Sequence, residues 1–115
     1  MIVYYSKTNN TERFVKKLKT SSVTIDDYDG SKNFILITPT YFFGQVPQEV
    51  NNFLELYSNN MVGVISSGNR NWGENYGKAG EKISLAYNVP LIHKFELSGS
   101  KKDKEIVDKY IKTMI

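Results

Sequence analysis

Residues 66–76, SSGNRNWGENY, bring the single tryptophan of the chain together with amide side chains and glycines. Amides can offer donors and acceptors to the polar edge of a ring, and glycines let a backbone approach a ligand closely. The apolar residues MVGVI (61–65) come directly before and predict a buried strand. We therefore expect this loop to lie at a strand end and to bind a planar ligand. The alternative is an Asn- and Gly-rich turn with an incidental surface Trp. The predicted contacts are Ser67, Gly68, Asn69, Asn71, Trp72 and Gly73.

A second polar stretch, SKTNNT at 6–11, lies between a strand-like and a helical pattern. The N-terminus of a helix presents free N–H groups and a partial positive charge, and this arrangement receives a phosphate. Hydroxyls add donors, and an Asn can adopt the left-handed conformation that tight phosphate loops often give to glycine. An N-capped turn without a ligand is the alternative. Neither GxxxxGK followed by Ser or Thr nor GxGxxG is present, so the loop indicates a mononucleotide phosphate. The predicted contacts are Ser6, Lys7, Thr8, Asn9, Asn10 and Thr11.

Aromatic side chains mark a third stretch, TPTYFFGQVP at 38–47, which comes directly off an apolar, β-rich segment. Three consecutive aromatic residues cannot all point into a core. At least one should lie at the binding edge and stack on a planar apolar ring, whereas core packing is expected for the other two. The predicted contacts are Thr38, Pro39, Thr40, Tyr41, Phe42, Phe43 and Gly44.

A phosphate pocket, a stacking slot and a hydrogen-bonding edge together describe flavin mononucleotide (FMN). The phosphate is expected at 6–11, and the isoalloxazine ring between aromatic side chains of 38–47 and 66–76. The pyrimidine edge of that ring would face the backbone of 66–76. No acid–base pair or nucleophile accompanies the loops, so no catalytic side chain is predicted.

Strands and helices alternate along the chain, which implies a parallel sheet covered on both faces. Five strands that alternate with helices in this way predict a flavodoxin-like doubly wound α/β sheet of order 2-1-3-4-5. Such a sheet binds its ligand at the carboxyl ends of the strands. The segment 27–32 is too short for a crossover helix, so a truncated connection is expected there. We expect a single domain over 1–115 with strands at 2–6, 23–26, 33–38, 61–66 and 90–97, and helices at 11–19, 47–58, 76–87 and after a capping box at 100–103.

The composition is that of an ordinary globular protein, with 40% hydrophobic and 23% charged residues among 115. The absence of cysteine excludes disulfides, a thiolate zinc site and a Cys nucleophile. His93 is the single histidine and is expected to be a surface or packing residue, so no metal site is predicted. No apolar run has the roughly 20 residues of a membrane span, and no leader precedes the first strand, so we expect a cytoplasmic protein without membrane contact. The net charge of +3 comes with scattered lysines, which does not favour nucleic-acid binding.

The stretch SKTNNT resembles the phosphate loop SxTGNT of flavodoxins, with Asn9 in place of the usual glycine. The segments ITPTY, SGNRNWGENY and KFELSG resemble a narrower family over nearly the whole chain. This family is NrdI, the flavodoxin-like partner of class Ib ribonucleotide reductase. Many members carry several glycines in the second loop, where this chain has Phe42 and Phe43 before Gly44.

This resemblance implies an accessory redox flavoprotein that binds FMN and receives electrons from a flavin reductant. The reduced flavin would react with dioxygen and supply superoxide, or would supply electrons, to the small subunit of the reductase. There a dimanganese–tyrosyl radical cofactor for deoxyribonucleotide synthesis is assembled, and the metal would belong to that partner. A general electron-transfer flavodoxin and a non-catalytic FMN-binding interaction module remain alternatives.

The charge balance bears on the potentials of the expected flavin. Ordinary flavodoxins are strongly acidic, and negative surroundings disfavour the anionic reduced flavin. A net charge of +3 should disfavour it less. We therefore expect the two one-electron steps to lie closer together than in a low-potential flavodoxin.

Overall fold

The computed structural model describes residues 1–41 and 44–114. One five-stranded sheet contains β1 (Ile2–Tyr4), β2 (Ser22–Thr24), β3 (Phe34–Thr38), β4 (Met61–Gly68) and β5 (Leu91–Glu96). The α-helices are α1 (Asn10–Lys17), α2 (Gln48–Tyr57), α3 (Lys78–Tyr87) and α4 (Lys101–Met114). Short 3-10 helices, η1 and η2, cover Ser58–Asn60 and Arg70–Asn75.

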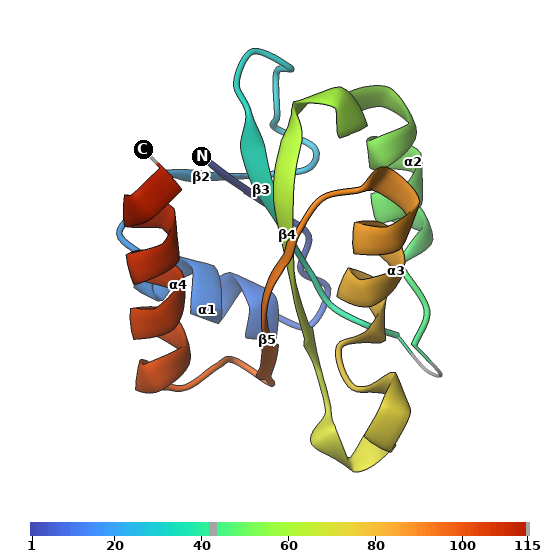
Figure 1. Cartoon of the computed structure of the whole chain (residues 1–115), viewed down its shortest axis with the longest axis vertical. Coiled ribbons are helices and arrows are strands. Elements are labelled where there is room, and N and C mark those ends of the chain that lie inside the picture. Colours follow the sequence, from blue (N-terminus) through green and yellow to red (C-terminus); the bar gives the residue numbers. More distant parts are fainter. Residues whose placement is uncertain (42–43, 115) are drawn as a thin grey trace.

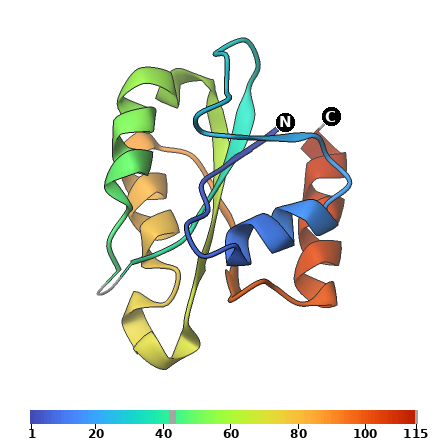
Figure 2. The ribbon, with the colours of Figure 1, turned by 180° about the vertical axis from the view of Figure 1, so that it is seen from behind.

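The strands of this sheet pair in parallel, in the spatial order β2-β1-β3-β4-β5. The prediction of a doubly wound sheet of order 2-1-3-4-5 is therefore confirmed. Helices α1 and α4 cover one face and α2 and α3 cover the other, as Figures 1 and 2 show from opposite sides. The direction of winding reverses between β1 and β3, so the loops after β1, β3 and β4 meet at the carboxyl edge of the sheet.

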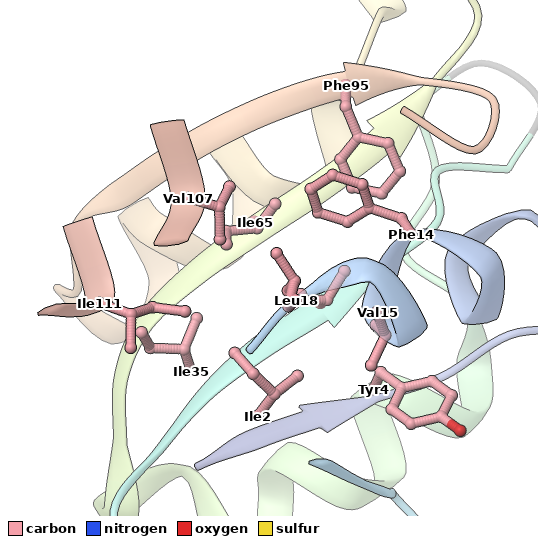
Figure 3. Close-up of a cluster of buried hydrophobic side chains, with 11 residues drawn as sticks. Ile2, Tyr4, Phe14, Val15, Leu18, Ile35, Ile65, Phe95, Val107 and Ile111 are labelled. Atoms are coloured by element: carbon pink, nitrogen blue, oxygen red, sulfur yellow. The ribbon is translucent and has the colours of Figure 1, made fainter. Parts of the chain in front are cut away.

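Alternate residues of the central strands face opposite helix layers, because side chains alternate along a strand. Ile35 and Ile37 pack in the cluster with α1 and α4, while Leu36 packs in the cluster with α2 and α3. In the first cluster the rings of Phe14 and Phe95 stack with their centroids 4.0 Å apart, as Figure 3 shows. This pair fixes the first helix against the end of β5, beside the loops of the candidate site.

The connection from β2 to β3 contains no helix, as expected for 27–32. Tyr28 fills the space instead, with its buried ring edge-on to Phe34 and Phe53 at centroid distances of 5.0 and 5.7 Å. Its hydroxyl donates to the carbonyl of Lys32 and accepts from Nδ2 of Asn60 at 2.9 Å. One buried tyrosine thus supplies packing that a crossover helix would otherwise provide.

The last helix, α4, begins with the expected capping box. The N–H of Asp103 donates to Oγ of Ser100 at 3.1 Å, and its carboxylate accepts from the N–H of Ser100 at 2.8 Å. Nε2 of His93 lies 2.7 Å from the same carboxylate. Burial alone would raise the pKa of Asp103, but the hydrogen bonds from His93 and Ser100 outweigh it and hold the pKa below its usual value. His93 is therefore tied to the start of a helix.

Neither a metal site nor a membrane span is found in the described part of the chain. Its His, Asp and Glu residues form no cluster of three or more that could hold a metal ion. None of the helices in residues 1–41 and 44–114 is long and apolar enough to cross a membrane.

Candidate functional site

The three predicted loops meet at the carboxyl ends of β1, β3 and β4 and enclose a pocket of about 260 Å³. In Figure 1, the yellow loop after β4 marks this end of the sheet, at the bottom of the view. Larger grooves of about 460 and 390 Å³ lie along α2, but neither is lined by more than one of these loops. The described residues around the pocket are Thr8, Asn10, Thr11, Pro39, Thr40, Tyr41, Ser67, Gly68, Asn69, Trp72 and Leu97. All of them except Leu97 belong to the predicted set.

The first loop forms a tight turn at the start of α1. Asn9 adopts the left-handed conformation expected for Asn9 or Asn10, with φ of +69°. Oγ of Ser6 accepts from the N–H of Glu12 at 3.1 Å, so this hydroxyl already caps the helix. The N–H groups of Asn10 and Thr11 have no intrahelical acceptor, because they belong to the first turn. Both residues line the pocket, so the start of α1 lies at the pocket, and a helix start of this kind can receive an anion.

In the second loop an antiparallel bridge joins Tyr41 and Gln45. Their N–H groups and carbonyls pair at 2.9 and 2.7 Å. Gly44 has φ of +87°, and a Cβ built on it would lie 2.7 Å from Cβ of Lys78. The position therefore requires glycine. The predicted contacts Phe42 and Phe43 lie outside the described residues, so Tyr41 is the aromatic wall that the structure places in the pocket.

Both threonines of this loop serve the fold, and one of them also lines the pocket. Thr38 is fully buried, and its hydroxyl donates to the carbonyl of Pro39 at 3.0 Å. It does not reach the pocket lining. Oγ1 of Thr40 accepts from the N–H of Ala79 at 3.3 Å and thereby ties the loop to α3. Pro39 and Thr40 both line the pocket.

The third loop is organised by Asn69. Its side-chain oxygen accepts from the N–H of Asn71 at 2.9 Å, and its carbonyl accepts from the N–H of Trp72 at 3.0 Å. These bonds place Trp72 at the rim of the pocket, with 41% of its surface exposed. An aromatic ring at the rim offers a face on which a planar ligand can stack. Asn71 is exposed and does not line the pocket.

The glycines of the third loop also meet requirements of the fold. A Cβ on Gly68 would lie 2.7 Å from the backbone nitrogen of Gly77, so the lack of a side chain at Gly68 lets these two backbone segments approach each other closely. A Cβ on Gly73 would meet nothing within 4 Å, and its φ of +57° is what favours glycine there. Gly68 lines the pocket, whereas Gly73 is not among the residues around it.

Cations surround the base of the third loop. The guanidinium of Arg70 lies 5.6 Å from the ring centroid of Tyr76, and Nζ of Lys94 lies 5.8 Å from it. Lys94 also pairs with Glu81 at 2.7 Å. The backbone N–H of Arg70 donates to the carboxylate of Glu96 at 3.1 Å, which ties the loop to the end of β5. The loop is thus fixed from two elements.

A carboxylate–tyrosine contact lies behind Tyr41. The hydroxyl of Tyr5 donates to Oε2 of Glu49 at 2.5 Å, and this bond raises the pKa of Tyr5 strongly. The same bond lowers the pKa of Glu49. Burial raises the pKa of Tyr41, and Nζ of Lys7 lies 5.9 Å from its ring centroid. Both tyrosines therefore stay protonated at neutral pH, and no side chain here is set up as a base.

One pocket residue, Leu97, was missed by the sequence interpretation. It follows β5, whose end was not expected to contribute to the site, and 57% of its surface is exposed. The local signal was the Ser-Gly pair at 98–99, which indicates a turn but no direction for the preceding side chain.

The sheet order, the helix start at its carboxyl edge and the two aromatic walls define a flavodoxin-like protein. A solved short-chain flavodoxin associated with a bacterial microcompartment shares this fold, with a TM-score of 0.75 at 21% identity, covering 99% of this chain and 97% of that one. The family model described as NrdI flavodoxin-like matches residues 2–109. Proteins named NrdI from Macrococcus caseolyticus and Bacillus licheniformis are 48% and 43% identical, over 90% and 99% of this chain and 81% and 88% of their own lengths. The chain belongs to the NrdI flavodoxin-like family, which implies a flavin cofactor.

Proposed function

We propose that this chain binds FMN in the pocket at the carboxyl ends of β1, β3 and β4. The observation that supports this is the convergence of a helix start with free N–H groups and two aromatic side chains on one pocket. The residues proposed to contact FMN are Thr8, Asn10, Thr11, Pro39, Thr40, Tyr41, Ser67, Gly68, Asn69 and Trp72.

These residues fit the three chemically different parts of FMN. The first turn of α1 would hold the phosphate through backbone N–H groups and the hydroxyls of Thr8 and Thr11. Tyr41 and Trp72 would flank the isoalloxazine ring. The backbone of the third loop, which Asn69 organises, would face the polar edge of that ring. Ser6 and Asn9 would act indirectly, by shaping the turn that holds the phosphate.

The function proposed for the bound flavin is to supply an oxidant to a partner protein. When bound and reduced, FMN can pass an electron to dioxygen and yield superoxide. We propose that the recipient is the small subunit of class Ib ribonucleotide reductase, where the oxidant would serve assembly of a dimanganese–tyrosyl radical cofactor. The described residues around the pocket would hold and orient the flavin, and none of them forms an acid–base pair with another.

Flavin binding is tested by loading the purified protein with FMN and desalting it. Retained flavin absorption and quenched FMN fluorescence are expected, because Trp72 and Tyr41 would stack on the ring. Thr11→Val should weaken binding, since it removes a hydroxyl at the helix start. Thr113→Val is the matched control, because this threonine lies at the far end of α4. Loss of all flavin on desalting the wild type would refute the proposal.

The oxidant-supplying role needs a second experiment. The reduced protein is mixed with the manganese-loaded small subunit of a class Ib reductase and with air, and the tyrosyl radical is measured by electron paramagnetic resonance. Radical formation that superoxide dismutase suppresses would support superoxide as the oxidant. Flavin binding without radical formation would favour an electron-transfer flavodoxin or a non-catalytic binding module.

A further inference from the structure

The turn that follows β5 places a leucine in an unfavourable backbone conformation. The N–H of Gly99 donates to the carbonyl of Glu96 at 2.9 Å, which closes a four-residue turn with Leu97 at its second position. Leu97 has φ of +55°. Positive φ at this position defines the primed turn types, in which glycine, asparagine and aspartate dominate. The other non-glycine residues with positive φ in the described ranges are both asparagines, Asn9 and Asn88.

The side chain of Leu97 does not compensate for this conformation by packing in the core. More than half of its surface, 57%, is exposed, whereas the core residues of β5 and α1 beside it are fully buried. Leu97 lines the pocket together with Trp72. Two of the large hydrophobic residues exposed on this chain therefore share one pocket rim.

Contacts from two sides hold the turn in place. The N–H of Leu97 donates to the carbonyl of Gly68, at 3.3 Å, at the start of the third loop. Nζ of Lys17, on α1, donates to the carbonyls of Ser98 and Gly99 at 3.3 and 3.4 Å. A strained backbone conformation lowers the stability of the fold, so it persists only where the surrounding contacts impose it. Residues strained in this way are typical of binding sites.

We propose that Leu97 contacts the bound flavin from a fourth segment of the chain, beside the three loops, and that its left-handed backbone is retained because it directs the side chain into the pocket. This inference rests on the flavin-binding function proposed above. Asparagine or glycine would form the turn without strain, so the turn alone does not explain a leucine. Covering its exposed surface with an aromatic ligand would give the hydrophobic side chain the burial that it lacks in the ligand-free protein.

Substitutions at Leu97 separate the side chain from the backbone. Leu97→Ala and Leu97→Gly both remove the apolar contact, and the Kd for FMN, measured by fluorescence quenching, should rise roughly fourfold to twentyfold in each. Leu97→Met keeps an apolar side chain and should bind within about twofold of the wild type. In the ligand-free protein, Leu97→Gly should melt a few degrees above Leu97→Ala, because only glycine relieves the strain. This order is the reverse of that at ordinary positions.

Asn88 provides the matched control. It has φ of +55° at the end of α3 and does not line the pocket. Asn88→Gly should likewise melt above Asn88→Ala, but both should bind FMN as the wild type does.

The outcomes that would overturn the inference are distinct from those that would overturn flavin binding. Wild-type FMN affinity in Leu97→Ala and Leu97→Gly would overturn the contact, and equal melting of the two variants would overturn the strain. A wild-type protein that fails to bind FMN would refute the proposed function, and this inference with it.

Discussion

Replacing Gly44 with alanine should destabilise the protein more than the same replacement at Gly73. Both glycines have positive φ, +87° and +57°, which costs a residue with a Cβ about 1–2 kcal/mol. Alanine also restricts the unfolded chain, which offsets about 0.4–1 kcal/mol of this cost. At Gly73 a new Cβ meets nothing within 4 Å, so a net loss of about 1 kcal/mol is expected. At Gly44 it would lie 2.7 Å from both Cβ and Cγ of Lys78, and such overpacking adds about 1–3 kcal/mol.

The assay is thermal unfolding of the ligand-free protein, followed by circular dichroism. In a domain of this size 1 kcal/mol shifts the Tm by roughly 3–6 °C, so Gly44→Ala should melt about 3–18 °C below Gly73→Ala. Comparing two alanine variants subtracts the cost that a positive φ imposes at each position, whereas the contact with Lys78 is added at position 44 alone. Equal Tm values would show that Lys78 and α3 can shift away from the new Cβ at little cost. The reasoning that position 44 requires glycine for lack of space would then be wrong.

Three further predictions concern charge and protonation. Asp103→Asn removes the carboxylate that caps α4, so the free energy of unfolding should fall by about 1–2 kcal/mol at pH 7. The folded-state pKa of Asp103 is lowered. The difference in unfolding free energy between the wild type and Asp103→Asn should therefore be fully present above the unfolded pKa of about 4, and it should vanish as the pH falls through the folded pKa. Urea unfolding at several pH values measures it, and a difference that persists in strong acid would contradict the assignment. Tyr5→Phe removes the hydrogen bond to Glu49 and should raise the pKa of that carboxyl toward its ordinary value, as a carboxyl NMR titration would show; an unchanged pKa would mean that another group lowers it. In the FMN-loaded protein the net charge of +3 should bring the two one-electron steps close together, and widely separated steps in a spectroelectrochemical titration would refute this.

The order of the sheet could be predicted because alternating strands and helices leave few topologies open. The ends of the strands differ from the predicted ones. β1 ends at Tyr4 rather than at the predicted residue 6, although the N–H of Tyr5 still donates to the carbonyl of Ile37 at 3.1 Å. β4 continues to Gly68 because it pairs there with Glu96 of β5. A local pattern cannot show a partner strand that lies far along the chain.

The three loops of the site could be found from their residue types, but the contacts within them could not. Gly68 is recognisable as a position without a side chain, yet the sequence does not say that Gly77 occupies the space beside it. Leu97 could not be found because nothing in the letters KFELSG reveals a positive φ at a leucine. Its place in the pocket depends on β5 lying next to β4, which is a property of the assembled sheet.

The turn at the start of α1 is held by contacts within the chain. Ser6 caps the helix and Asn9 forms the left-handed bend, and both features involve only groups of the chain itself. A phosphate that arrives there has no backbone to order, so little conformational entropy is lost at this loop on association. Capture of the phosphate end should therefore be limited by encounter with the pocket, and a chain that loses its cofactor keeps this part of the site ready to take it up again.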